Sequence, residues 1–314
     1  MTAASTAAAT GARPVMGSAR QTRAARLTVR GIVLLYIALL LALPVAMVFV
    51  RAFEGGLEPV LQAIGRPAFQ SAFWLTVMIT LITVPLCTVM GVITALAIAR
   101  RRFPGRSILN SLVDLPFALS PVVIGLSLFL VYGANSPIGG FLASSGISVI
   151  FAVPGMVLAT IFVCLPFVIR EVVPVLREIG TDQEEAAYTL GAGSIRTFFR
   201  VTLPAIRWGI LYGVILTVAR SLGEFGAVAI VSGKISGKTV TLTTHVQERY
   251  EAFDVVGAYT ASIVLASMAL LVLFGMQLYQ SGRLSRKQSN EDEQPRGLLL
   301  EPIGASESSA RGGA

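Results

Sequence analysis

The segment EEAAYTLGAGSIRTFFRVTLP, residues 184–204, is a polar stretch that separates two long apolar runs of the chain. Thr181 and Glu184 have the spacing of a capping box, so we expect a helix to begin near Asp182. Gly191 is expected to end that helix, because glycine adopts the left-handed backbone conformation without a steric penalty from a Cβ atom. The segment therefore predicts a short helix followed by a glycine turn.

A second short helix is expected after the turn. Ser194 can cap its N-terminus, and an apolar stripe then recurs at the helical spacing i, i+3, i+4 and i+7. The stripe, which has Arg196 and Arg200 alongside, consists of Ile195, Phe198, Phe199 and Thr202. Pro204 is expected to end this helix, because proline has no backbone N–H to donate to the preceding turn. Taken alone, a hairpin that exposes Phe198 and Phe199 is also typical of a loop lying on lipid headgroups.

The composition excludes an ordinary soluble domain. Hydrophobic residues make up 54% of the 314 residues, charged residues make up 13%, and the mean hydropathy is +0.75. The formal net charge of +8 would suit a nucleic-acid-binding protein, but no basic helix interleaved with aromatic residues supports that class. Cys87 and Cys164 fall inside apolar runs, which predicts buried free thiols and neither a disulfide nor a metal site.

The apolar runs are long enough to cross a bilayer several times, since a membrane-spanning helix needs about 20 apolar residues. Residues 115–169 carry no charge and are too many for one helix, so the Gly-, Ser-, Asn- and Pro-rich segment 132–148 is the expected break. The predicted fold class is all-α, with six transmembrane helices at residues 32–50, 70–99, 111–131, 151–169, 205–231 and 255–280.

Two polar tails flank this predicted domain of residues 31–280. Residues 1–30 hold five arginines and no acidic residue, and residues 281–314 are rich in polar side chains. Both are expected to be disordered cytoplasmic tails. An arginine-rich and acid-poor N-terminal segment is also typical of an organelle transit peptide.

The distribution of basic residues predicts how the helices are oriented. Of the 25 Lys and Arg residues, 19 fall in the two tails and in the loops after the second and fourth predicted helices. Five fall in the loops on the other side, and Arg220 lies inside a predicted helix. Because loops rich in Lys and Arg remain cytoplasmic, we expect both termini and the segment 182–204 to lie in the cytoplasm.

Two apparent motifs do not indicate a site. Residues 236–239, SGKT, look like the end of a phosphate-binding loop, but Ser232 stands where that motif requires glycine. His245 is the only histidine in the sequence, so a histidine-based metal cluster is not possible. No metal or nucleotide site is predicted in this chain.

The segment 182–204 resembles a signature of the permease subunits of ABC importers. The match departs from the usual pattern only at Val201, where isoleucine is common, and it is carried by Glu185, Ala186, Ala187, Gly191, Leu203 and Pro204. In that family the segment is a coupling helix that inserts into a groove of a cytoplasmic ATPase. The resemblance implies a type I ABC importer permease with an ATPase-coupling role for Glu185, Ala186, Ala187, Gly191, Phe198, Phe199, Leu203 and Pro204.

Further segments resemble one branch of this family, the CysW-type permease subunits of sulfate and thiosulfate importers. They are RSLGEFGA at 220–227, DLPFALSPVV at 114–123, PGMV at 154–157 and PFVIREVVPV at 166–175. The resemblance implies a transport subunit of the bacterial inner membrane that is not itself an enzyme and binds no cofactor. Its implied partners are a CysT-type permease, two CysA-type ATPases that bind ATP and Mg, and an extracytoplasmic sulfate-binding protein. A permease for molybdate or another oxyanion, or a CysT-type subunit, is the alternative.

Arg220 and Glu224 are two charged residues inside one predicted span, which is costly in a membrane and requires a reason. They are four residues apart, so they can pair on one helix face. One hypothesis is a translocation pathway at Arg220, Gly223, Glu224 and Gly226, in which Arg220 supplies positive potential to a crossing dianion and the glycines line a constriction. The other hypothesis is an ion pair that only holds the helices together.

A charged residue such as Glu224 inside a span is also compatible with two other classes of function. It would be the relay residue of a proton-coupled carrier, or the general base of a membrane-embedded enzyme. The enzyme reading lacks an accompanying nucleophile or metal set in the sequence. Dependence of uptake on ATP hydrolysis separates the carrier from an ABC importer.

Overall fold

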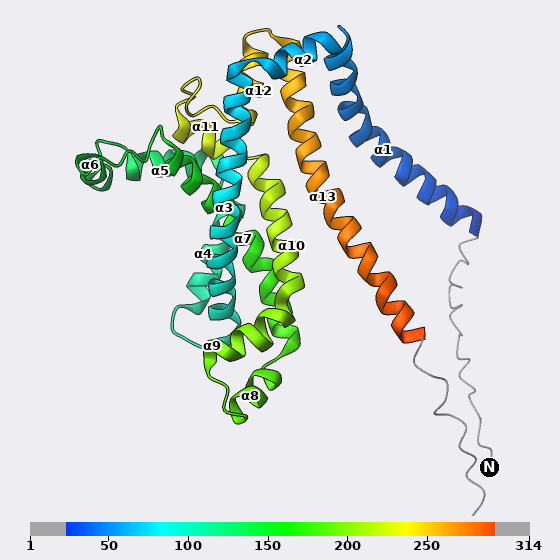
Figure 1. The fold of residues 1–314 in the computed structure, drawn as a ribbon, viewed down its shortest axis with the longest axis vertical. Helices are drawn as coiled ribbons and strands as arrows, with labels where there is room; N and C mark the ends of the chain where they lie inside the picture. The colour runs from blue at the N-terminus through cyan, green and yellow to red at the C-terminus, as the bar shows by residue number, and fades with distance from the viewer. Residues whose placement is uncertain (1–22, 293–314) are drawn as a thin grey trace, which may run out of the picture. The chain divides into compact units, whose positions relative to one another are not determined.

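The computed structural model describes residues 23–292, which form helices and connecting loops with no β-strand over that range (Figure 1). The chain divides into two units, residues 1–50 and 51–314. The first unit contains most of α1 (Arg23–Phe53), an apolar helix with Pro44 inside it. The predicted tails fall largely outside the described residues. α1 nevertheless begins at Arg23, and α13 (Val255–Asp292) continues to Asp292, so both helices extend into segments that were predicted to be disordered.

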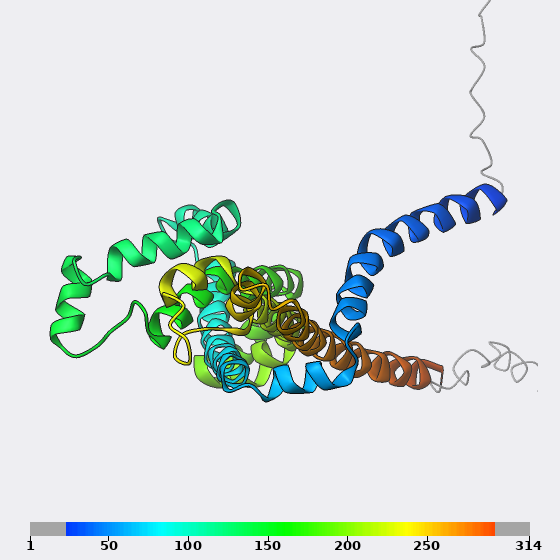
Figure 2. The same ribbon diagram turned by 90° about the horizontal axis from the view of Figure 1, so that it is seen from above.

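The second unit is a bundle of helices. Its first half consists of α2 (Leu57–Gly65), α3 (Pro67–Arg100), α4 (Arg106–Ala118), α5 (Pro121–Tyr132) and α6 (Pro137–Ser144). Its second half begins with α7 (Val153–Ile179), α8 (Asp182–Thr189), α9 (Ser194–Thr197) and the π-helical turn η1 (Phe198–Thr202). It continues with α10 (Leu203–Leu222), α11 (Gly226–Ser232), α12 (Leu242–Glu251) and α13 (Val255–Asp292). Within this unit, α5 and α6 project to one side of the other helices (Figure 2).

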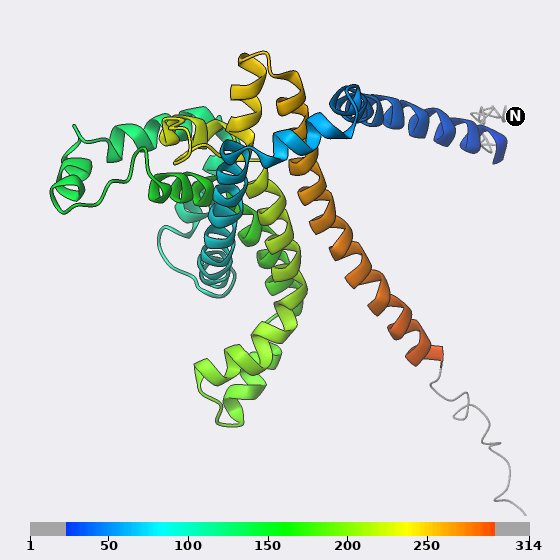
Figure 3. The ribbon, with the colours of Figure 1, turned by 45° about the horizontal axis from the view of Figure 1, so that its top comes forward.

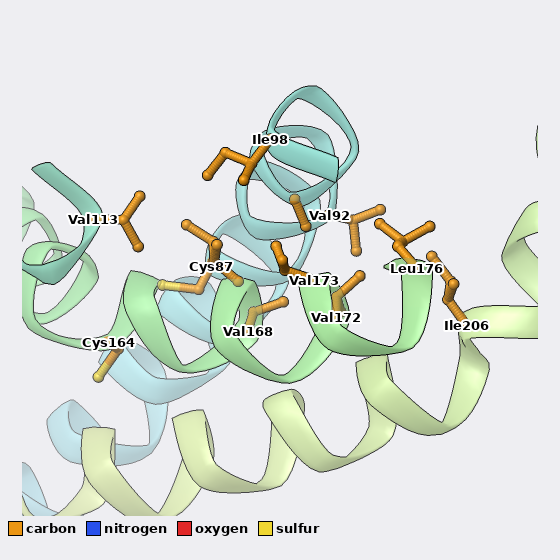
Figure 4. Close-up of a cluster of buried hydrophobic side chains, with 12 residues drawn as sticks. Cys87, Val92, Ile98, Val113, Cys164, Val168, Val172, Val173, Leu176 and Ile206 are labelled. Atoms are coloured by element: carbon orange, nitrogen blue, oxygen red, sulfur yellow. The ribbon is translucent and has the colours of Figure 1, made fainter. Parts of the chain in front are cut away.

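The core of the bundle is formed by α3, α7 and α10, which pack against one another. Glycines bring these helices close, since a Cβ atom added at Gly91 or Gly213 would lie within 2.7 or 2.8 Å of Val168. Small residues at such contacts are typical of packing between membrane helices. The buried cluster around them includes Cys87 and Cys164 (Figure 4), so the prediction of buried free thiols is confirmed.

Five helices of the described chain are long and apolar enough to cross a membrane, and the bent pair of α4 and α5 supplies a sixth candidate. The predicted spans 70–99, 151–169 and 255–280 correspond to α3, α7 and α13. The predicted all-α fold class is therefore confirmed, although two of the predicted spans differ in form.

The third predicted span, 111–131, is wrong as a single helix. α4 ends at Ala118, α5 begins at Pro121, and the two helices are bent by 113°. Ser120 before the proline has an extended backbone with φ −63° and ψ 136°. The ring of Pro121 disfavours a helical conformation at the preceding residue. Pro116 lies inside α4 without breaking it, so proline alone does not reveal the position of the bend.

The fifth predicted span, 205–231, is also interrupted. α10 ends at Leu222, and the separate helix α11 begins at Gly226. A Glu224 carboxylate oxygen accepts a hydrogen bond from the N–H of Ala227 at 3.0 Å, which satisfies one of the free donors at the start of α11. Glu224 therefore lies at a junction between two helices and not in the middle of one.

The connections of the bundle gather at two opposite ends. α8 and α9 lie at one end, whereas α2, α12 and the start of α13 lie at the other (Figures 1 and 3). The long helices α3, α7 and α10 lie between these ends, whereas α13 starts beside α12 and diverges from them (Figure 1). This arrangement places the segment 182–204 far from the corner that joins α12 to α13.

Candidate functional site

The segment 182–204 forms the predicted helical hairpin. α8 ends at Thr189, and Gly191 follows in the left-handed conformation with φ 80°. The N–H of Gly191 donates to the carbonyl of Tyr188, and the N–H of Ala192 donates to that of Ala187, both at 3.0 Å. This pair of bonds is the Schellman motif that ends many helices. The predicted left-handed turn at Gly191 is confirmed.

The predicted side-chain caps of the two helices are wrong. The Thr181 hydroxyl donates to the Glu185 carboxylate at 2.7 Å and accepts no bond from the backbone of α8. The residue before α9 is Gly193, and no side chain caps that helix, so Ser194 does not act as a cap. Glu184, the second member of the expected capping box, bonds to the bundle instead.

Glu184 bonds to α3 and η1, and its partner Arg100 bonds in turn to α7. Arg100, the last residue of α3, has its Nε 3.1 Å from Glu184 Oε2, and both side chains are only 15% exposed. The Thr202 hydroxyl, on η1, donates to Glu184 Oε1 at 2.9 Å. Arg100 also donates from Nη1 to the carbonyl of Leu176 in α7 at 2.7 Å. The hairpin, α3, α7 and the helix that leads into α10 are thus held together.

The second helix of the hairpin does not end at Pro204, contrary to the prediction. α9, η1 and α10 form one helical span from Ser194 to Leu222, which is 29 residues long. The N–H of Leu203 donates to the carbonyl of Phe198, five residues earlier. A π-helical turn of this kind widens the backbone, so the ring of Pro204 is accommodated where an ordinary helix would clash. The hairpin is therefore continuous with a membrane helix.

An apolar surface is exposed on the hairpin. We call it the hairpin surface, and it consists of Tyr188 (49% exposed), Leu190 (87%), Ile195 (77%) and Phe199 (61%). Phe198 was predicted to be exposed as well, but it is half-buried and packs against the core cluster. Its ring centroid lies 5.1 Å from that of Phe199. The helical stripe identified Ile195 and Phe199, but it did not include Tyr188 and Leu190.

The other residues of the predicted coupling motif divide between the surface and its support. Glu185, Ala186, Gly191 and Pro204 are exposed, whereas Ala187 and Leu203 are half-buried. Of the exposed members, Ala186 is small and Gly191 forms the turn. The motif therefore describes the shape of the hairpin more than the apolar groups that it presents.

Arg220 and Glu224 form the predicted ion pair at the far end of α10. Arg220 Nη1 lies 2.7 Å from Glu224 Oε2, with the Glu224 side chain 1% exposed and the Arg220 side chain 30% exposed. The carbonyl of Glu224 accepts a hydrogen bond from the Thr243 hydroxyl on α12 at 2.8 Å. Together with the bond from Ala227, these contacts make Glu224 the link between α10, α11 and α12.

Small and hydroxyl-bearing residues surround this junction. A cavity of about 10 Å³, enough for one water molecule, is lined by Glu224, by the hydroxyl-bearing residues Thr76, Thr160, Ser221, Thr241 and Thr243, and by Ile79, Leu222 and Val228. Gly226 packs closely against α5, since an added Cβ atom would lie 2.9 Å from Pro121. Gly223 is exposed and has no comparable contact. Of the two glycines proposed for a constriction, only Gly226 is required by close packing.

A charged cluster lies at the end of the bundle opposite the hairpin. Asp254, which precedes α13, pairs with Arg66 and lies 3.8 Å from Arg249. Burial alone would raise the pKa of Asp254, but hydrogen bonds from the N–H of Gly257 and from Arg66 hold it below its ordinary value. The ionised carboxylate fixes the corner between α12 and α13.

Sequence comparisons connect these features with known transport proteins. Residues 87–286 match the family model of the binding-protein-dependent transport system inner membrane component. The sulfate transport system permease protein CysW of Synechocystis sp. is 55% identical over 240 residues, which are 76% of this chain and 87% of that protein. CysW of Escherichia coli (strain K12) is 48% identical over 250 residues, which are 80% of this chain and 86% of that protein. The sulfate permease CysT of Salmonella typhimurium is 36% identical over 251 residues, covering 80% and 91% of the two chains.

A solved structure has the same fold at much lower sequence identity. It is the crystal structure of a bacterial alginate ABC transporter in complex with an alginate pentasaccharide-bound periplasmic protein. The matched chain has a TM-score of 0.67 and 18% identity, and the alignment covers 79% of this chain and 92% of that chain. At this level of identity, the similarity establishes the shared fold.

Proposed function

The chain belongs to the family of binding-protein-dependent transport system inner membrane components, and we propose that it is a membrane-spanning subunit of an ATP-driven sulfate importer. The observation that carries the proposal is the identity of 48–55% to CysW sulfate permeases over most of their length. Thiosulfate is proposed as a second substrate, because it is also a dianion of similar tetrahedral shape.

The same comparisons support a specific set of partners. Identity to the CysT relative is 36%, well below that to the CysW relatives, so we assign this chain the CysW-type position beside a CysT-type permease. Two cytoplasmic ATPases, which bind ATP and Mg, would dock on the hairpin surfaces of the two permeases. A sulfate-binding protein would dock at the opposite end. ATP hydrolysis then resides on the ATPases, and this chain transmits its effect.

The hairpin surface is suited to docking on an ATPase. It presents four apolar or aromatic side chains around a turn. The left-handed residue Gly191 and the ion pair of Glu184 with Arg100 hold that turn in place. Exposed apolar patches on an otherwise polar segment mark sites of interaction with another protein. Because Arg100 and Thr202 tie the hairpin to α3 and η1, a displacement of the docked hairpin moves these helices with it.

The helical span from Ser194 to Leu222 is the element that carries this movement across the membrane. Its 29 residues correspond to a length of about 43 Å at 1.5 Å per residue. One end belongs to the hairpin, and the other end meets the Glu224 junction with α11 and α12. A rigid element between two joints can convert closure of the ATPases into a change between inward and outward openings.

Arg220 is proposed to face the translocation pathway. The Arg220 side chain remains 30% exposed, although the side chain of its partner Glu224 is 1% exposed. A charged side chain inside a membrane protein faces the bundle interior or an aqueous cavity and not lipid. Arginine presents several N–H donors and keeps its charge, so Arg220 can attract a sulfate dianion while Glu224 prevents tight trapping.

Sulfate uptake in a bacterial strain that lacks its own CysW tests the proposal. Expression of this chain with its CysT-type partner, ATPase and binding protein is expected to restore ATP-dependent uptake of radiolabelled sulfate. Uptake that continues with an inactive ATPase would instead indicate a carrier. Inhibition by excess molybdate without inhibition by thiosulfate would identify a permease for another oxyanion.

Cysteine labelling tests the proposed orientation, with both termini and the hairpin in the cytoplasm. Single cysteines are placed at the exposed residues Ser144, Lys238 and Ser194 in a background that lacks Cys87 and Cys164. An impermeant thiol reagent added outside the cell should label positions 144 and 238 but label 194 only after the membrane is opened. The reverse pattern would place the hairpin on the wrong side for an ATPase.

A further inference from the structure

The corner between α12 and α13 contains a phenylalanine in an unfavourable backbone conformation. Phe253 has a φ of 59°, in the left-handed region. Its N–H donates to the carbonyl of Tyr250 at 3.1 Å, and the N–H of Asp254 donates to that of Arg249 at 2.9 Å. These bonds form a Schellman motif, in which the residue with positive φ is usually glycine. A bulky residue at this position is strained and requires an explanation.

The same motif occurs with glycine at the opposite end of the bundle. α8 ends at the hairpin with Gly191 in the position that Phe253 occupies after α12, and the two pairs of hydrogen bonds correspond. The corner geometry therefore does not need a phenylalanine. A glycine would form it with less strain, because it has no Cβ atom.

Internal packing explains a second phenylalanine with positive φ but does not explain Phe253. Phe151 has a φ of 61°, its ring centroid lies 5.8 Å from that of Phe129, and its ring covers Gly233. Phe151 is 48% exposed, so about half of its surface has packing contacts of a kind that Phe253 lacks. Phe253 is 90% exposed, so its ring gains almost nothing from the rest of the chain.

The backbone next to Phe253 is fixed by its neighbours, and the surroundings of the ring are polar. Tyr250, 63% exposed, lies one turn earlier between charged neighbours, Arg249 and Glu251. Asp254 accepts a hydrogen bond from the N–H of Gly257 at 3.0 Å and pairs with Arg66 and Arg249. The backbone of the corner is therefore fixed, and an aromatic residue on a fixed backbone loses little conformational freedom on binding.

We propose that Phe253, with Tyr250 beside it, is an aromatic anchor for the soluble binding protein that delivers sulfate. This inference rests on the proposed function, which places the corner on the outer side of the membrane. Binding energy at protein interfaces is concentrated in a few aromatic or arginine side chains that fill pockets of the partner. The charged residues that flank Tyr250 favour a polar protein surface as the partner over the lipid bilayer.

The position of the corner agrees with this partner. It lies at the end of the bundle opposite the hairpin surface (Figure 3), so an ATPase and a binding protein can engage the chain at once. The solved alginate transporter whose chain shares this fold was crystallised in complex with a periplasmic protein.

The test replaces Phe253 in the complete importer, purified with its permease partner and ATPases. Phe253→Gly removes the ring and also the backbone strain, so the thermal stability of the complex should stay the same or rise. The dissociation constant for the sulfate-loaded binding protein, measured in detergent, is expected to increase by about tenfold or more. Phe253→Tyr keeps an aromatic ring and is expected to bind nearly as the unaltered complex does.

Three results would overturn the inference. Unchanged binding by Phe253→Gly would show that the ring does not touch the binding protein. A lower thermal stability of the same variant would show that the ring supports the fold. A defect that occurs in lipid vesicles and not in detergent would show that the ring contacts the bilayer. Failure of the unaltered complex to transport sulfate would instead contradict the proposed function, so the two failures are distinguishable.

Discussion

Glu184 and Glu224 join helices at opposite ends of the same helical span, but their surroundings differ. Glu184 is 15% exposed, lies beside the hairpin surface and draws its partners from α3 and η1. Glu224 is 1% exposed, lies among hydroxyl groups and pairs with Arg220. Both carboxylates pair with an arginine, but the Glu224 carboxylate is almost completely buried, so the loss of an ion-pair partner costs more there than at the partly exposed Glu184. The first joint is therefore suited to transmitting force from a partner, and the second to holding the membrane helices together.

Removal of Glu224 is expected to have the largest effect of the changes considered for these two sites. Glu224→Ala leaves Arg220 without its partner and the N–H of Ala227 without its acceptor, and breaking a buried pair costs about 3–5 kcal/mol. The amount of assembled complex in the membrane, measured by immunoblot, is expected to fall severely. Glu224→Gln keeps an acceptor and should assemble better. Equal, normal assembly of both variants would show that the junction does not depend on the pair.

Changes at Arg220 distinguish a role in transport from a structural role of the same junction. Arg220→Gln keeps a donor but removes the charge, so assembly and basal ATP hydrolysis should persist while sulfate uptake falls about tenfold or more, a loss of 1.4 kcal/mol or greater. Exchange of the two residues, Arg220→Glu with Glu224→Arg, restores the pair but not the position of the charge. Normal uptake by the exchanged protein would support a purely structural pair.

Glu184 is expected to give a smaller and different defect. Glu184→Ala removes the acceptor of Arg100 and Thr202, which costs about 1–3 kcal/mol. We expect assembly to be nearly normal and ATP hydrolysis to continue with reduced uptake per ATP. Gln183→Ala, one residue away and exposed, is the matched control. A similar loss of coupling in both variants would show that the contacts of Glu184 with Arg100 and Thr202 do not transmit the movement of the hairpin.

The glycine turn provides the smallest of the four effects. Gly191→Val places a β-branched residue at φ 80°, at a cost of about 1–2 kcal/mol, and should weaken ATPase association in co-purification. Gly193→Val is the control, since Gly193 has an ordinary φ of −73° and open space around it. Recovery of intact, fully active complexes from the Gly191→Val strain would show that the turn is not needed for association with the ATPase.

The hairpin shows how far local patterns predict structure. The turn at Gly191 follows from its own backbone, so the sequence was sufficient to predict it. The capping box at Thr181 failed because Arg100, 84 positions from Glu184, offers that carboxylate a charged partner. No pattern within the hairpin contains this information.

The prolines show the same limit in the membrane helices. Pro116 is accommodated in α4, Pro121 begins a new helix after a 113° bend, and Pro204 follows a π-helical turn in a continuous span. One residue type thus has three outcomes. The local sequence contains the steric conflict, but packing against neighbouring helices decides how the backbone resolves it.

The sequence by itself determined the all-α class, the approximate number of membrane crossings and the glycine turn, because lipid solvation and backbone sterics act on each segment separately. Motif resemblance also placed the chain in its transporter family. Only the tertiary structure decided the partners of Glu184, the interruption between α10 and α11, and the burial of Phe198. It also showed that the ring of Phe151 packs against Phe129 and Gly233, whereas the ring of Phe253 is left exposed. These features depend on contacts between segments far apart in the sequence, and such contacts exist only after the helices have packed.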